Sequence, residues 1–278
     1  DMHTVGYNFK PWTEAKAIAD GPSIRKYVNE TADEYDIRRH IRFDHKVQSA
    51  SWDSAAGHWI VTSALPDGSN TSVTGDFLFM CGGYYSYDEP HRPEFRGESD
   101  YQGQVLHPQF WPEDLDYRGK RVVVIGSGAT AMTMVPSMTQ NGAKVTMVQR
   151  SPTYVVSRPA EDKIANLLRR WLPERWAYAI TRLKNTTLSG YFYRQTRTQP
   201  EKTKAQLLQM ATANLGEEMV KAHFTPSYNP WDQRMCLIPN GDLYQAINDG
   251  DATVVTGDID TWTTTGLRMT DGTEIEAD

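Results

Sequence analysis

Apolar residues recur at two different spacings in the first third of the chain. Between residues 20 and 35 the spacing is helical, with Pro22 in the first turn, which predicts a helix with one face in the core. That face comprises Ile24, Tyr27, Val28, Ala32 and Tyr35. Shorter β-branched and aromatic runs then predict a small antiparallel insertion with strands at 41–43, 46–52, 58–63 and 71–81. The last run ends in Gly82 and Gly83, which indicates either a buried strand that returns toward a bound nucleotide or an ordinary strand and turn.

The clearest local signal is an apolar run at residues 121–125 that ends on Gly126-Ser-Gly128 and continues into a helix-forming stretch. Gly126 lets the chain turn sharply, Gly128 has no Cβ to hold a pyrophosphate away, and Ala131 lets the helix pack close to the sheet. A second apolar strand at 144–148 completes a βαβ unit, so we favour a dinucleotide-binding turn over an ordinary strand-to-helix turn. Cofactor contacts are predicted for Gly126, Ser127, Gly128, Ala129, Thr130, Ala131 and Met132.

The end of the second strand indicates which nucleotide this turn would bind. A site for NAD places an acidic residue there to bind the ribose 2′-hydroxyl, but this strand ends in Gln149 and Arg150. A guanidinium suits a 2′-phosphate through charge-assisted hydrogen bonds. We therefore expect NADP, with Gln149 and Arg150 among the cofactor-binding residues.

The remainder of the chain alternates between irregular, helical and strand patterns. Residues 84–119 are rich in Pro, Gly, Tyr and acidic residues and are interpreted as an inter-domain connection. Residues 154–230 show helical patterns only, and their Arg and Lys side chains are interpreted as a solvated helix face. From residue 232 the pattern predicts a short helix at 243–247, strands at 253–255, 261–264 and 267–270, and a hairpin at Asp271-Gly272.

Composition excludes several classes of protein. The chain has 278 residues, 39% of them hydrophobic, and a net charge of −6 without a basic block, so nucleic acid is not expected as a partner. Cys81 and Cys236 form no C-x-x-C pair, which fits a reducing, cytoplasmic compartment, and no metal site is predicted. No apolar run approaches the roughly 20 residues of a membrane span, although peripheral membrane contact stays open. The first residue, Asp1, and the strand-like pattern that stops at Asp278 suggest a chain cut at both ends.

One segment upstream of the glycine turn resembles a family signature. Tyr101-Gln-Gly103-Gln-Val-Leu-His107-Pro-Gln-Phe-Trp111-Pro112 is similar to the F-x-G-x-x-x-H-x-x-x-W-P pattern of Baeyer–Villiger monooxygenases, with Tyr101 in place of the usual Phe. The similarity continues through Trp111-Pro-Glu-Asp-Leu-Asp-Tyr117, Gly126-Ser-Gly-Ala-Thr-Ala131, Gln149-Arg-Ser-Pro-Thr-Tyr154 and Asn229-Pro-Trp-Asp-Gln-Arg234. Over essentially the whole chain, these segments resemble the class B flavoprotein monooxygenases of the ethionamide-activating type.

The resemblance implies an α/β fold with two dinucleotide-binding, Rossmann-like domains. Residues 1–116 would be the later part of the FAD-binding domain, whose N-terminal glycine fingerprint is not in this sequence. Residues 117–153 and 232–278 would form the NADP-binding domain, and residues 154–231 a helical insertion in it. Val47 would contact the adenine of FAD through its backbone, with a core valine as the equally weighted alternative.

The chemistry that the resemblance implies is oxygen insertion. NADPH reduces FAD, O₂ adds to give a C4a-peroxyflavin, and one oxygen atom is inserted into a ketone or transferred to the sulfur of a thioether or thioamide. Arg234 matches the active-site arginine of the family, the alternative being a surface arginine paired with Asp232. A lysine that some members carry next to that arginine is Gln233 here, so the expected NADP preference depends on Arg150.

Two questions stay open at the level of sequence. His107 is expected at a domain junction, where it orders a hinge by hydrogen bonding rather than acting as a general base. The alternatives to a monooxygenase are a flavin-dependent NADPH reductase without oxygen insertion and a non-catalytic dinucleotide-binding fragment. The absence of a C-x-x-C pair argues against the commonest reductases.

Overall fold

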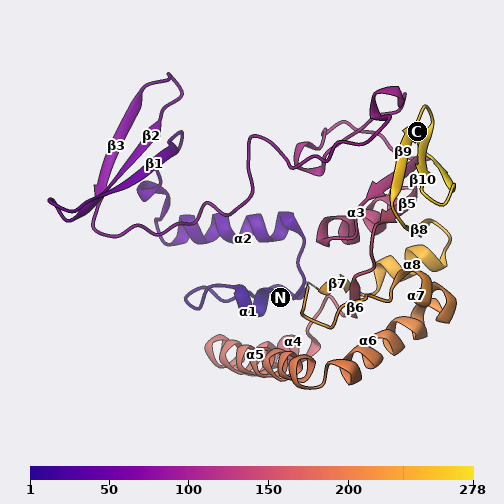
Figure 1. Ribbon diagram of the computed structural model, residues 1–278. Helices are drawn as coiled ribbons and strands as arrows, with labels where there is room; N and C mark the ends of the chain where they lie inside the picture. Colours follow the sequence, from indigo (N-terminus) through magenta and orange to yellow (C-terminus); the bar gives the residue numbers. More distant parts are fainter. Residues whose placement is uncertain (234) are drawn as a thin grey trace. The chain divides into compact units, whose positions relative to one another are not determined.

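The computed structural model, shown in Figure 1, describes residues 1–233 and 235–278. The predicted catalytic residue Arg234 therefore lies outside the described residues. The chain divides into two compact units, Asp20–Pro90 and a larger unit formed by Asp1–Ala19 with His91–Asp278. Each unit is described by itself.

The unit Asp20–Pro90 contains one helix and one antiparallel sheet. Helix α2 (Gly21–Glu34) begins where Pro22 and the Asp20 side chain, which accepts a hydrogen bond from the Ser23 N–H at 2.8 Å, favour a helix start. The sheet has the order β1-β2-β3, with strands β1 (Lys46–Asp53), β2 (His58–Ala64) and β3 (Asn70–Gly75). The predicted helix and the strands at 46–52 and 58–63 are confirmed.

Two strand predictions in this unit are wrong. The residues 41–43 form no strand, because β1 begins at Lys46 opposite Ala64, the last residue of β2. The residues 77–81 are not a strand either, because β3 ends at Gly75 opposite Trp59 and β2 has only one residue before that. Without backbone partners the apolar run is irregular, and Phe77, Phe79 and Met80 are exposed.

The prediction that one face of α2 lies in the core is confirmed only at Tyr27. Ile24, Val28 and Tyr35 are exposed by more than a third of their surface. The period of apolar residues locates a stripe on a helix but does not say what covers it. In the described structure Tyr27 is buried, whereas Ile24, Val28 and Tyr35 are only partly covered.

The larger unit is built on a parallel sheet of order β4-β5-β8. Strand β4 (Arg121–Ile125) leads into helix α3 (Ala129–Gln140), which returns to β5 (Lys144–Gln149), and β8 (Ala252–Thr256) pairs on the other edge of β5. The βαβ unit, the short helix α8 (Asp242–Asn248) and β8 are therefore where the sequence predicts them.

The two faces of this sheet carry alternate residues of each strand. Val124, Met147 and Val254 belong to a core that includes α3 and α8. Val123, Val148 and Val255 pack on the other side against an antiparallel sheet of order β11-β10-β9. Its strands are β9 (Ile259–Thr263), β10 (Gly266–Met269) and β11 (Glu274–Glu276). The sheet is thus covered on both faces, as parallel sheets are.

Four helices occupy most of the segment between β5 and the C-terminal strands, as Figure 1 shows. They are α4 (Lys163–Trp171), α5 (Glu174–Thr198), α6 (Pro200–Leu215) and α7 (Glu217–His223). The sequence predicts only helices in residues 154–230. This prediction is wrong at β6 (Tyr154–Arg158), which pairs in parallel with β7 (Met235–Pro239). The pairing joins segments about 80 residues apart, so no local pattern revealed it.

Residues 84–119 are irregular, with the short turns η2 (Glu98–Asp100) and η3 (Pro108–Phe110).

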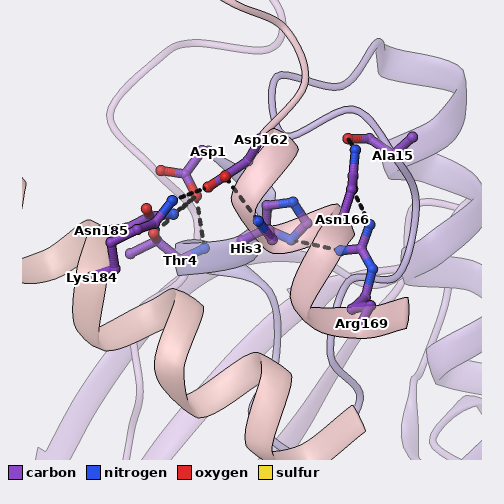
Figure 2. A network of polar contacts seen from close by, with 10 residues as sticks. Asp1, His3, Thr4, Ala15, Asp162, Asn166, Arg169, Lys184 and Asn185 are labelled. Atoms are coloured by element: carbon purple, nitrogen blue, oxygen red, sulfur yellow. Dashed lines mark hydrogen bonds and ion pairs between the residues drawn. The ribbon is translucent and has the colours of Figure 1, made fainter. Parts of the chain in front are cut away.

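A polar network attaches the N-terminal segment, with the short helix α1 (Met2–Val5), to α4 and α5 (Figure 2). Lys184 Nζ lies 2.6 Å from the Asp162 carboxylate, which also accepts from the Ala165 N–H at 3.0 Å and so caps α4. Arg169 donates to the Glu14 carbonyl oxygen at 3.0 Å and to Nδ1 of the buried His3 at 3.4 Å.

None of the described helices is both long enough and apolar enough to span a bilayer.

We expect the free energy of unfolding to fall between about pH 7.5 and about pH 5.5. Burial and the neighbouring Arg169 lower the pKa of His3 below the usual 6.5, outweighing the opposing effect of Asp162. The unfolded chain therefore binds a proton near pH 6.5 that the folded chain does not bind, which favours unfolding as the pH falls. Urea midpoints at the two pH values should show this loss. His3→Gln should reduce it and the exposed His91→Gln should not, and an unchanged pH dependence in His3→Gln would contradict the assignment.

Candidate dinucleotide-binding site

The glycine turn after β4 has the geometry that the sequence predicts. Gly126 has φ +121°, which side-chain-bearing residues rarely adopt, so glycine is needed to leave the strand. Its N–H donates to the Val148 carbonyl oxygen at 2.7 Å and holds the turn against the end of β5. Gly128 follows as the residue before the first turn of α3, in an extended conformation.

The N-terminus of α3 presents free backbone donors. Gly128 offers no side-chain cap, and the first bond within the helix runs from the Met132 N–H to the Gly128 carbonyl oxygen at 3.0 Å. Among the described residues nothing accepts from the N–H groups of Ala129, Thr130 or Ala131. These donors and the helix dipole favour an anion such as a pyrophosphate.

The side chains in this turn divide into two groups. Ala129 and Thr130 are exposed at the start of the helix. Ala131 and Met132 are buried, Met132 within the core beneath the sheet. The small Ala131 side chain lets α3 pack close to the strands, as expected. Any contact of Ala131 or Met132 with a nucleotide would therefore use the backbone.

The side chain of Gln149 is buried at the end of β5 and connects three elements. Its Nε2 donates to the His223 carbonyl oxygen at 2.7 Å, at the end of α7, and to the Thr256 hydroxyl at 3.0 Å, in β8. The His223 Nδ1 lies 2.8 Å from the same hydroxyl, and burial lowers the pKa of His223. These contacts join β5, α7 and β8 through the side chain, so the nucleotide contact of Gln149, which stays a prediction, would use its backbone.

Arg150 has the opposite environment. It is exposed, and no described residue forms a hydrogen bond or ion pair with it. The segment that it begins is tied to the glycine turn, because the Ser127 hydroxyl donates to the Ser151 carbonyl oxygen at 3.4 Å. The structure therefore brings Ser127 together with the segment that begins at Arg150, at the carboxyl ends of β4 and β5, the edge where open parallel sheets bind ligands.

Sequence reasoning missed one residue behind this turn. The buried thiol of Cys236, in β7, donates to the Ser127 carbonyl oxygen at 3.8 Å. This contact places Cys236, two residues after Arg234 in the sequence, against the turn. The contact of Cys236 with the turn becomes visible only once β7 is seen to pair with β6. Asp232, on the other side of Arg234, is bound to Arg197 at 2.7 Å.

Val47, predicted to contact the adenine of FAD, lies on β1 in the other unit. Its side chain is 60% exposed, which excludes the alternative of a core valine within that unit. Val47 and the glycine turn belong to different units, and each unit is described by itself. Its backbone contact with FAD stays a prediction.

The signature segment before β4 makes local structural contacts. A Cβ on Gly103 would overlap the ring of Tyr101, which packs edge-on against Trp262 at 5.4 Å. Trp111 likewise packs edge-on against Tyr117 at 5.9 Å. His107 Nδ1 accepts from the Gln109 N–H at 3.2 Å and caps η3. This ring thus orders the local backbone by hydrogen bonding.

The flavin-binding monooxygenase-like (FMO-like) family matches residues 17–217. The chain belongs to this family. The FAD-containing monooxygenase EthA of Mycobacterium tuberculosis is 50% identical to it over 280 residues, and the probable FAD-binding monooxygenase AlmA of Acinetobacter baylyi is 43% identical over 281 residues. Both similarities cover the whole of this FMO-like chain but only 57% and 56% of the relatives, so the chain spans little more than half their length.

Solved structures agree with the FMO-like assignment at the level of the fold. An oxidized steroid monooxygenase bound to NADP matches with a TM-score of 0.76 and 22% identity, over all of this chain and 60% of that one. A cyclohexanone monooxygenase from Rhodococcus sp. Phi1, bound to NADP⁺, matches with a TM-score of 0.68 and 19% identity, over 96% of this chain and 56% of that one. The α/β fold class predicted from the sequence is confirmed.

We expect Gln149→Met to reduce stability without affecting nucleotide affinity. The substitution leaves the His223 carbonyl and the Thr256 hydroxyl without their donor, which should lower the free energy of unfolding by roughly 1–3 kcal/mol. Urea unfolding and NADPH titration by fluorescence would separate the two effects. Arg150→Ala is the matched control, with unchanged stability and weakened NADPH binding. Weakened binding at full stability in Gln149→Met would instead make this side chain a nucleotide contact.

Proposed function

We propose that this chain is the nucleotide-binding part of an FAD- and NADPH-dependent monooxygenase of the Baeyer–Villiger type. The observation that carries the proposal is the free N-terminus of α3 beside an unpaired Arg150, in a chain of the flavin-binding monooxygenase-like family. Relatives named as FAD-containing monooxygenases support the flavin, and neighbours solved with NADP support the second nucleotide.

The residues of the turn fit NADP. The N–H groups of Ala129, Thr130 and Ala131 would bind the pyrophosphate, and Gly126 and Gly128 would leave room for it. Arg150 would bind the 2′-phosphate with its planar, permanently charged fork. No carboxylate stands at the end of β5 to bind a 2′-hydroxyl. The site therefore prefers NADPH over NADH.

The domain organisation in this proposal follows the family resemblance. Residues 1–116 belong to the FAD-binding domain, in which the backbone at Val47 meets the adenine. Residues 117–153 and 232–278 bind NADP, and residues 154–231 are an insertion. When bound, FAD supplies the two-electron chemistry that couples NADPH oxidation to the use of O₂.

Arg234 is the catalytic residue that we propose. Its segment, Pro230-Trp-Asp-Gln-Arg234, matches the position of the active-site arginine in the family. With FAD bound, the permanent positive charge of Arg234 would stabilise the anionic oxygen that develops during oxygen transfer. One oxygen atom of O₂ enters a ketone, giving an ester, or is transferred to sulfur, giving an S-oxide, and the other leaves as water.

A cytoplasmic location is part of the proposal and is supported by the two free cysteines.

We expect NADPH to bind more tightly than NADH, and Arg150→Ala to remove most of the difference. Loss of one charge-assisted phosphate contact should weaken NADPH binding by roughly 10- to 100-fold, while NADH affinity stays unchanged. Titration of both nucleotides into the two proteins measures this. Arg268→Ala, which removes an exposed arginine paired with Asp260, is the control. Equal affinities for NADPH and NADH in the wild type would refute the NADP assignment.

We expect Arg234→Ala in the intact protein to lower the rate of oxygenated product formation by about 10²–10³-fold. Arg234→Lys keeps the charge but not the planar fork and should also be impaired. Stopped-flow measurement of flavin reduction and ¹⁸O₂ incorporation into product should be made separately. Product formation should fall far more than NADPH affinity. Near wild-type formation of ester or S-oxide would exclude the role of Arg234, and no ¹⁸O in any wild-type product would indicate a reductase instead.

A further inference from the structure

Helices α4 and α5 carry large apolar side chains on their exposed surfaces. On α4 the exposed stripe is Ile164, Leu167 and Trp171, and on α5 it is Trp176, Ile180 and Leu183. The spacings of three, four and seven residues place each set on one face of its helix. Trp171 is 74% exposed, Leu183 69% and Trp176 65%, so the greater part of these three side chains is uncovered in the described structure.

The buried side of α5 consists of small and polar residues, among them Ala177, Thr181 and Thr196. Thr181 is 3% exposed, and Lys184 forms the ion pair with Asp162 that belongs to the network of Figure 2. The helix therefore turns small and polar side chains inward and leaves Trp176, Ile180 and Leu183 exposed. This arrangement is the reverse of the one that a helix adopts against a protein core.

The two tryptophans lie at the same end of the α4–α5 hairpin. Trp171 is the last residue of α4, Trp176 lies in the first turn of α5, and only Leu172 and Pro173 separate the two helices. The tip of the hairpin is therefore aromatic. Trp is the residue most enriched where proteins meet the headgroup region of a bilayer.

Positive charge surrounds the apolar stripes. Residues 163–198 contain eight basic residues and one acidic residue, Glu174, in a chain whose net charge is −6. Lys163, Arg170 and Arg175 are exposed and form no ion pair with a described residue. The Arg170 guanidinium lies 5.9 Å from the centre of the Trp171 ring. Such cations repel a second copy of the same face and attract an anionic surface.

We propose that the α4–α5 hairpin docks on the surface of an anionic lipid bilayer. Trp171 and Trp176 enter the headgroup region at the tip, the apolar stripes lie along the interface, and Lys163, Arg170 and Arg175 contact lipid phosphates. Amphipathic helices with aromatic apolar faces and basic flanks bind membranes in this way without spanning them. Docking would bring an enzyme of this family to substrates that dissolve in lipid.

The test is flotation of the intact protein with vesicles of phosphatidylcholine alone and with 30% phosphatidylglycerol. We expect binding to the anionic vesicles only, weakened by added NaCl. Arg170→Glu with Arg175→Glu should lower the partition constant at least 25-fold, since each cation at such a surface contributes about fivefold. Arg25→Glu with Arg42→Glu changes the net charge equally at exposed sites elsewhere and should bind as the wild type does.

The apolar contribution is tested with Trp171→Ser and Trp176→Ser, each expected to weaken binding about tenfold or more. Phe77→Ser, at an equally exposed aromatic residue in the other unit, is the control. Brominated lipids should quench the fluorescence of the wild type more than that of Trp171→Phe with Trp176→Phe. Circular dichroism verifies that all variants are folded.

Three results would overturn the proposal. One is a wild type that does not float with the anionic vesicles, as expected if more of the protein covers this face. The other is equal binding by the wild type and by the tryptophan and arginine variants. If the tryptophan variants instead dissociate an oligomer of the lipid-free protein, the face is a contact between copies, and the proposal is wrong.

Discussion

The parallel pairing of β5 with β4 on one side and β8 on the other is the interaction on which the candidate site depends. It aligns the carboxyl ends of the strands, and the bond from the Gly126 N–H to the Val148 carbonyl oxygen fixes the turn at that edge. The same pairing places Thr256 beside Gln149, whose amide extends the edge to α7. A shift of one residue between β4 and β5 would move the turn, the helix N-terminus and Arg150 out of register together.

The parts of the site that could be predicted from sequence are those determined by local geometry. Gly126 is needed because the backbone has a positive φ there, and a short side chain at Ala131 is needed because the helix packs against the strands. Such requirements are visible in a few adjacent residues. The exposed, unpaired state of Arg150 likewise follows from its position just after the last residue of β5.

The predictions that failed depend on distant partners. The strand β6 requires β7, with which it pairs in parallel. The apolar residues 77–81 have the composition of a strand but extend past the end of β2. In each case the sequence gives the propensity of a segment, whereas the pairing decides its structure. The contact of Cys236 with the glycine turn could not be foreseen for the same reason.

The insertion shows how one set of interactions determines two surfaces. The Lys184–Asp162 pair and the Asp162 cap of α4 require the polar side of α5 to face inward, next to His3 and Arg169. A partly buried ion pair with further hydrogen bonds fixes the orientation of the groups that form it, although it adds little net stability. With that side fixed, Ile180 and Leu183 point outward whatever their hydropathy. The exposed apolar stripe of α5 is therefore a consequence of how the N-terminal segment is held.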